Sequence, residues 1–241
     1  MSLTNKHIIL THYGNEDSFN ILKNFGANLY HFPMINIITN SNVKPFNISN
    51  FDYYIFTSKN GVDSFFSLDF VKDKKISAFC LGDKTKSALV DNGINPIFAS
   101  TQNYADNLIA DLLAHQLLNN KKILLVLGNL ADNKLSEGLS SICNVERLNV
   151  YRTNLETSVR KEITTLIENK NTISTFTSPS AFKAFYKMYN PKKTTLVSIG
   201  KTTSNYIKSL GFSADIISKK QTYDGISKEI INYYETKKIT K

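Results

Sequence analysis

Short apolar runs alternate along the chain with amphipathic stretches of helical periodicity. The apolar runs predict strands at Ile8–Leu10, Asn28–Pro33 with an extension over Ile35–Ile38, Asp52–Thr57, Ile76–Leu81, Asn95–Ala99, Lys122–Leu127, Val145–Tyr151, Thr195–Ile199 and Ala214–Ile217. Helical patterns fill the intervals, among them residues 16–24, 104–118 and 158–169. Strands that alternate with helices are typical of parallel sheets flanked by helices, so the pattern predicts an α/β fold.

Two strand-to-helix junctions in this pattern have almost the same sequence. An apolar strand runs into Thr57-Ser58 and another into Thr177-Ser178, and a helical pattern follows at once in both places. A serine at this position can cap the helix, and the backbone N–H groups of the first turn can hold an anionic group. One such junction is ordinary in an α/β protein, whereas two at matched positions indicate a duplication.

The duplication includes a second pair of turns. Gly82-x-x-Thr85 and Gly200-x-x-Thr203 lie about 120 residues apart, close to the interval between Ser58 and Ser178. Taken singly, each turn is typical of a helix start with a capping threonine, but duplication in register favours a ligand site. Parallel sheets bind ligands at the carboxyl ends of their strands, where all four turns lie. Two facing domains would enclose a cleft lined by hydroxyl and amide groups, and the repeat places a boundary near residue 119.

Composition and charge narrow the choice of partners only in part. Lys and Arg number 29 against 20 Asp and Glu, a formal charge of +9 that fits an acidic ligand, nucleic acid or a lysine-rich surface. Cys80 and Cys143 lie in or near apolar runs and are expected to be buried, reduced thiols. The four histidines have no metal-ligand spacing, which predicts no metal site. Neither a signal-peptide pattern nor a long apolar span occurs, and we expect a cytoplasmic protein.

Familiar catalytic and nucleotide-binding motifs are absent from the sequence. It contains no Walker loop, no dinucleotide fingerprint, no nucleophile triad and no evident pair of acid–base carboxylates. An enzyme with this sequence would use few strong acids or bases. Tyr151, near the end of a predicted strand, has two interpretations: a half-buried aromatic with a paired hydroxyl, or a phenol that donates a proton into the cleft. The residues alone favour the first.

Five short motifs, taken together as an ordered series, are specific. They are Ile55-Phe56-Thr57-Ser58-x-Asn60, Leu81-Gly82-x-x-Thr85, Asn149-Val150-Tyr151-Arg152-Thr153, Phe176-Thr177-Ser178-Pro179-Ser180 and Ser198-Ile199-Gly200-x-x-Thr203. In order and spacing, over essentially the whole chain, this series resembles the uroporphyrinogen-III synthase family. The resemblance implies two similar α/β lobes with parallel sheets, joined by a two-stranded connection, with the active-site cleft between them. It also moves the boundary: one lobe would hold residues 1–36 plus 154–241, and the other residues 37–153.

The activity implied by the resemblance is the closure of hydroxymethylbilane to uroporphyrinogen III, with inversion of ring D and loss of water. This is a lyase reaction of tetrapyrrole and haem biosynthesis that needs no metal or organic cofactor. The substrate is polyanionic, which suits the positive net charge. By the residue-by-residue match, Tyr151 would be the catalytic residue, and the substrate-binding residues would be Thr57, Ser58, Asn60, Gly82, Thr85, Gly128, Ser178, Gly200 and Thr203.

The sequence departs from the family pattern at two positions. His12 and Leu127 stand where many bacterial relatives have arginine, and Lys59, Lys84 or Lys201 would have to compensate. We expect a monomer whose lobes close on the ligand, with a transient hand-over of substrate from hydroxymethylbilane synthase, and with no nucleic-acid or membrane partner. A non-catalytic two-lobed binding protein for an anionic small molecule is the alternative, and nucleic-acid binding is the third interpretation. Neither explains the ordered motif series.

Overall fold

The computed structural model describes residues 2–15, 17–72, 74–100, 105–114 and 118–239, and the chain divides into two compact units. Unit one comprises Met1–Asn36 and Asn154–Lys241, and unit two comprises Ile37–Thr153. These ranges are those implied by the resemblance, and a spatial boundary near residue 119 is wrong. That each unit folds as a domain of its own stays a prediction.

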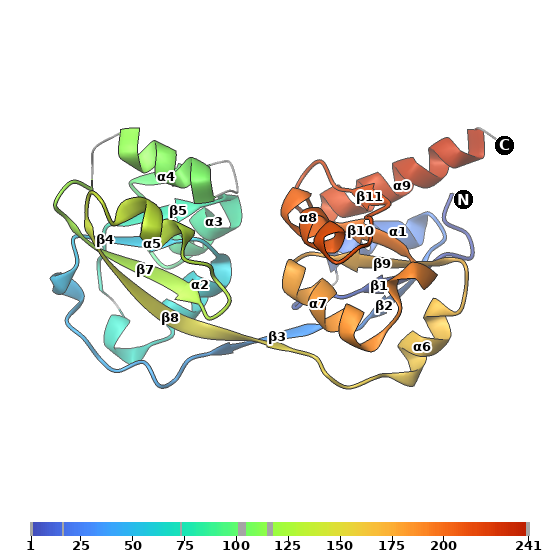
Figure 1. Cartoon of the computed structure of the whole chain (residues 1–241), viewed down its shortest axis with the longest axis horizontal. Coiled ribbons are helices and arrows are strands. Elements are labelled where there is room, and N and C mark those ends of the chain that lie inside the picture. Colours follow the sequence, from blue (N-terminus) through green and yellow to red (C-terminus); the bar gives the residue numbers. More distant parts are fainter. Residues whose placement is uncertain (1, 16, 73, 101–104, 115–117, 240–241) are drawn as a thin grey trace. The chain divides into compact units, whose positions relative to one another are not determined.

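Unit one is built on a five-stranded parallel sheet with the order β11-β10-β9-β1-β2. Its strands are β1 (His7–Leu10), β2 (Asn28–His31), β9 (Thr172–Phe176), β10 (Thr195–Ser198) and β11 (Ile216–Ile217). Its helices are α1 (Ile21–Asn24), α6 (Lys161–Ile167), α7 (Pro179–Met188), α8 (Lys201–Ser209) and α9 (Tyr223–Ile239), with short 3-10 turns at Asp17–Phe19 and Pro191–Lys193. Figure 1 shows these elements around the sheet.

Unit two contains a six-stranded sheet with the order β3-β8-β7-β4-β5-β6, in which β4 to β8 pair in parallel. The strands are β3 (Ile35–Thr39), β4 (Tyr53–Phe56), β5 (Ala78–Leu81), β6 (Phe98–Ser100), β7 (Lys122–Gly128) and β8 (Asn144–Leu155). The helices are α2 (Lys59–Phe66), α3 (Asp83–Asp91), α4 (Ala105–Ala114) and α5 (Lys134–Leu139), with 3-10 turns at Ile48–Asn50 and Asp69–Val71. The predicted α/β class is therefore confirmed.

Each sheet has a hydrophobic core on both of its faces, which is why central strands such as β1, β4 and β7 read as continuous apolar runs. In β1, for example, Ile8 and Leu10 pack on one face with α1 and α9, while Ile9 packs on the other with α6, α7 and α8. In unit two, α2 and α3 cover one face, and α4 and α5 cover the other. Helices on both faces leave the ends of the strands as the places where polar groups can gather.

Several predicted elements differ from the observed ones. The strand predicted to continue from Asn28 to Ile38 is two strands in different sheets, β2 and β3. Strand β8 extends well beyond Tyr151, and the short helix α5 lies in a segment for which no helix was predicted. Residue 16, residue 104 and residues 115–117, which belong to the helices predicted over 16–24 and 104–118, lie outside the described residues.

Candidate active site

The carboxyl ends of β4 and β7 form the topological switch point of the sheet in unit two. The two strands are neighbours, with Phe56 opposite Val126. From β4 the chain continues to β5 on one side, and from β7 it continues to β8 on the other. Parallel sheets bind ligands in the crevice that opens where connections diverge in this way. Ser58, just after β4, and Gly128, the last residue of β7, therefore occupy a favoured position for a site.

Ser58 caps helix α2, as predicted. Its backbone is extended, with φ −154° and ψ 149°, and the Gly61 N–H donates to Ser58 Oγ over 3.1 Å. The same oxygen lies 3.2 Å from the Tyr151 hydroxyl, within hydrogen-bond distance. A helix N-terminus, a serine and a tyrosine are thus joined in one series of hydrogen bonds. Gly61 had not been identified from the sequence, where the only signal is its place three residues after the capping serine.

Tyr151 reaches Ser58 because strand β8 contains a bulge. The register between β7 and β8 shifts at this point, so that Leu127 pairs with Asn149 but Gly128 pairs with Tyr151. Leu148, Val150 and Tyr151 all contact the core beneath α2 and α3, although consecutive residues of a regular strand face opposite ways. Bulges re-aim side chains in this manner. The sequence predicted a strand that ends at Tyr151, whereas β8 continues to Leu155, and the bulge itself was not predicted.

Gly128 is the residue on which the Tyr151 ring lies. A Cβ atom built on Gly128 would be 2.3 Å from Tyr151 Cζ, 2.4 Å from Cε2 and 2.7 Å from the hydroxyl oxygen. The φ of Gly128 is not positive, so its backbone alone would accept another residue. The requirement for glycine at this position therefore comes from the phenol ring.

The other predicted residues of unit two divide by exposure. Thr57 and Asn60 are half-buried next to Ser58, and Gly82 is the N-terminal cap residue of α3, with φ 82° and no side-chain capping bond. Thr85 is only 3% exposed and is not the cap, so the interpretation of the turn as a start capped by threonine is wrong. Besides the exposed side chains of Asp83 and Lys84, this turn offers the backbone N–H groups at the start of α3.

Unit one repeats the two helix starts, here at the carboxyl ends of β9 and β10. Ser178 caps α7, with the Ala181 N–H donating to its Oγ over 3.2 Å, and its hydroxyl lies 2.9 Å from that of Ser180. Gly200 begins α8 with no side-chain cap, and Thr203 is buried, at 2% exposure. Within each unit the fold brings the predicted residues to one edge of the sheet.

The residues that depart from the family pattern are buried. His12 has no exposed surface and stacks on His31, with ring centroids 4.6 Å apart. Leu127 lies in the core beneath α4 and α5. Of the lysines considered as replacements for arginine, Lys59 forms an ion pair with Asp63. Neither departing position therefore presents a side chain at the surface of its unit.

The cysteines and the metal-ligating residue types do not form a second candidate site in the described part of the chain. Both cysteines are free and buried, as predicted, and burial raises the pKa of Cys80 to about 11. No group of three or more His, Cys, Asp and Glu in the described part of the chain could hold a metal ion. Among its described helices, none combines the length and apolar character of a membrane span.

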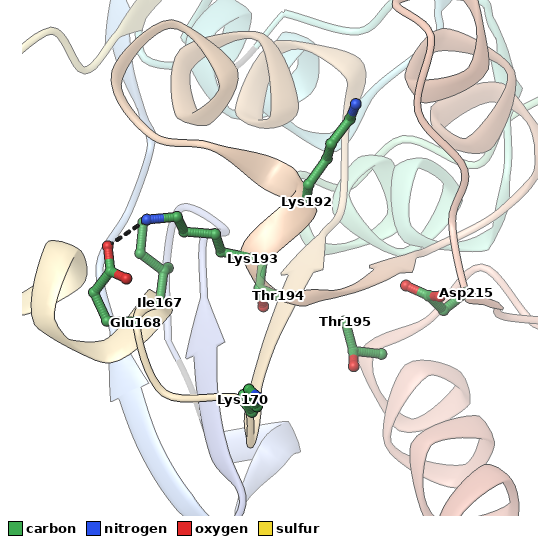
Figure 2. Close-up of a pocket in the computed structure, with 8 residues that line it drawn as sticks. All are labelled: Ile167, Glu168, Lys170, Lys192, Lys193, Thr194, Thr195 and Asp215. Atoms are coloured by element: carbon green, nitrogen blue, oxygen red, sulfur yellow. Dashed lines mark hydrogen bonds and ion pairs between the residues drawn. The ribbon is translucent and has the colours of Figure 1, made fainter.

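A pocket of about 450 Å³ in unit one lies at the opposite end of the sheet from Ser178. Residues that line it, Lys170, Thr195 and Asp215, precede or begin β9, β10 and β11. Figure 2 shows the ion pair between Lys193 and Glu168 on one side of this pocket. None of the predicted site residues lines it, and ligand sites in parallel sheets lie at the other end of the strands.

The chain is similar to known proteins over nearly its whole length. A family model described as uroporphyrinogen-III synthase HemD matches residues 19–228. The solved uroporphyrinogen-III synthetase from Helicobacter pylori is similar with 20% identity and a TM-score of 0.69, over 95% of this chain and 99% of that one. A mutant uroporphyrinogen III synthase from the extremely thermophilic bacterium Thermus thermophilus is similar with 15% identity and a TM-score of 0.63, over 96% and 99%. No curated protein sequence matches. At these identities the structural likeness shows the fold.

Proposed function

The chain belongs to the uroporphyrinogen-III synthase family, and from this premise we propose that its substrate is hydroxymethylbilane and that Tyr151 assists the departure of the substrate hydroxyl. The protein is an enzyme of tetrapyrrole and haem biosynthesis, a lyase-type cyclase that acts on a small-molecule tetrapyrrole. We therefore prefer this function to the alternative interpretation, a non-catalytic two-lobed binding protein.

The substrate supplies most of the reactivity for this reaction. A pyrrole nitrogen of hydroxymethylbilane can expel the terminal hydroxyl to give an azafulvene, which ring D then attacks through its substituted carbon. The bond from that carbon to the bridge of ring C then breaks, and the bridge carbon re-forms its bond to the unsubstituted carbon of ring D with loss of the proton there. Overall, water is lost and ring D is inverted in the product. The protein has to assist the departure and hold the linear chain in the geometry for attack at that carbon, which is a task of proximity and orientation. Such a task agrees with a sequence that lacks a nucleophile or paired acids.

The observation that carries the proposal is the hydrogen-bonded series from helix α2 to Tyr151. The Gly61 N–H donates to Ser58 Oγ over 3.1 Å, and the Tyr151 oxygen lies 3.2 Å from the same Oγ, where either hydroxyl can be the donor. We assign Ser58 as the donor to Tyr151, an assignment that leaves the phenolic proton of Tyr151 for a leaving hydroxyl. Hydrogen bonds in series polarise one another, so the helix N-terminus strengthens the phenol as a donor.

The carboxylates of the substrate require hydrogen-bond donors rather than a cofactor. We assign the half-buried Thr57, Ser58, Asn60 and Ser178 as direct contacts, and the backbone N–H groups that follow Gly82 and Gly200 as anion contacts. The buried Thr85 and Thr203 are assigned to holding those helix starts in place. Gly128 provides the surface on which the phenol ring rests. We further propose a cytoplasmic monomer that takes its substrate by transient hand-over from hydroxymethylbilane synthase.

Incubation with freshly prepared hydroxymethylbilane, followed by separation of the uroporphyrinogen isomers, tests the activity. We expect the type III isomer from the wild-type protein, because spontaneous closure without inversion of ring D gives type I. Exhaustive chelation should leave the rate unchanged. Type I as the sole product would refute the proposal, and a loss of activity that one added metal restores would refute the absence of a cofactor.

A further inference from the structure

Arg147, which had not been identified as a site residue from the sequence, donates five hydrogen bonds near Tyr151. Its Nε donates to Asn149 Oδ1 over 3.0 Å. Its Nη1 donates to the Asp132 carbonyl over 3.2 Å and to Asn133 Oδ1 over 3.1 Å. Its Nη2 donates to the carbonyls of Gly128 and Ala131 over 3.2 and 2.7 Å. A guanidinium has five N–H groups in a rigid fork, so these bonds use all of them.

The five acceptors show what this arginine holds. Four of them belong to residues 128–133, the segment that leads from β7 to α5, and three of those four are backbone carbonyl oxygens. Carbonyl oxygens that converge on one point repel each other unless a donor lies between them. None of the five acceptors is a carboxylate, and no N–H group of the guanidinium is left for a substrate carboxylate. Arg147 therefore fixes this segment rather than binding the ligand.

The fifth bond ties Arg147 to the bulge in β8. Asn149, which accepts from Arg147 through its side chain, offers its backbone carbonyl to Asn40 Nδ2 over 2.9 Å. The Asn40 backbone N–H donates to the next carbonyl, that of Val150, over 2.8 Å. Asn149 and Val150 directly precede Tyr151, and Gly128 directly contacts its ring. One guanidinium thus reaches both the segment beneath the phenol and the strand that carries it.

We propose that Arg147 is a positioning residue, which holds Gly128 and the bulge so that the Tyr151 phenol lies on Gly128 and meets Ser58. The consequence for the reaction rests on the proposed function of Tyr151. The consequence for geometry does not, because it concerns only where the phenol ring lies.

Three variants test the proposal: Arg147→Met, which removes the donors; Arg147→Lys, which keeps the charge without the fork; and Arg152→Met, which removes an exposed guanidinium from the same strand. The geometric measurement is the nuclear Overhauser contact between the Gly128 Hα protons and the Tyr151 ring protons. We expect this contact in the wild type and in Arg152→Met, and its loss in both Arg147 variants. Its persistence in a folded Arg147 variant would overturn the proposal, and Arg147→Lys serves if Arg147→Met fails to fold.

The kinetic measurement is single-turnover formation of the type III isomer. We expect the rate constant to fall about 10- to 100-fold in both Arg147 variants, with substrate affinity changed less than about threefold. In a Tyr151→Phe background, Arg147→Met should cost less than about threefold more, because it acts through the lost hydroxyl. The proposal would be overturned if Arg147→Met lowered the rate constant in the Tyr151→Phe background as much as it does in the wild type. It would also be overturned if Arg152→Met lowered the rate constant as much as the Arg147 variants do. A third result separates the two roles: the Arg147 variants lose the ring contact, but Tyr151→Phe forms the type III isomer at the wild-type rate. This result would refute the catalytic role of Tyr151 and leave the positioning role of Arg147 in place.

Discussion

Replacement of Gly128 by alanine should move the Tyr151 phenol without touching a polar group. The added methyl would lie 2.3 Å from Tyr151 Cζ, whereas ordinary contact begins at 3.4 Å, so the ring has to move by about 1 Å. The hydrogen bond between Tyr151 and Ser58 is already 3.2 Å long and cannot survive such a shift. We expect a fall of roughly 100-fold in the rate of type III formation, similar to the loss of a positioned proton donor.

The free energy of unfolding provides an independent measure of the same contact. Overpacking by one methyl group costs about 1–3 kcal/mol, and Gly128→Ala should show this cost in urea unfolding. In a Tyr151→Ala background most of the cost should vanish, because the ring that the methyl meets is absent. Gly138→Ala is the matched control, since its methyl would meet the side chain of Ile109, whose Cδ1 end at 2.7 Å can rotate away. A type III rate within about threefold of wild type in Gly128→Ala would refute this reasoning.

Four further outcomes are expected. Tyr151→Phe should slow single-turnover type III formation roughly 100-fold with about 1 kcal/mol of stability change, and a rate within about threefold of wild type would remove the phenol from catalysis. Ser178→Ala removes the cap of α7, so thermal unfolding should show a loss of about 1 kcal/mol, whereas an unchanged midpoint would contradict the capping role. The backbone N–H of Ser158, assisted by other donors, lowers the pKa of Glu156 from 4.5 to about 2. Because this pKa is depressed on folding, Glu156→Gln should lower the free energy of unfolding by about 1–2 kcal/mol at neutral pH, after allowance for solvent screening. The difference from wild type should disappear as the pH falls from 4.5 to 2. A difference in unfolding free energy that does not depend on pH would contradict this role of Glu156. The buried Cys80 thiol, with its pKa raised to about 11, should react with an aromatic disulfide reagent only on unfolding, and fast reaction of the native protein would show that it is accessible.

Local features of this protein follow from its amino-acid sequence without the fold. Continuous apolar runs predict strands that are buried on both faces, and such strands form the centre of both sheets. The caps at Ser58 and Ser178 were predictable because donor and acceptor lie three residues apart, so that local sequence contains the whole interaction. The repeat of about 120 residues was also visible, because it depends only on comparing the chain with itself.

The pairing between parts of the two repeats is set by the assembled fold. Strands β1 and β2 join β9, β10 and β11, while β7 and β8 join β4, β5 and β6, so each unit combines pieces of both repeats in the same order. Periodicity describes the faces of one element and contains no information about which distant strand lies beside it. From the residues alone, the repeat suggested a different boundary, and only the resemblance gave the observed ranges.

The same limit applies to the candidate site. The direction of Tyr151 depends on the register between β7 and β8, and a one-residue shift sends a side chain to the other face. The contact of its ring with Gly128 and the five bonds of Arg147 depend on that pairing as well. Most of these interactions join residues about 15 to 23 positions apart through a sheet, and no local pattern specifies them. The residues of the site were therefore predictable as types, whereas their direction and support depend on how the strands of the sheet pair.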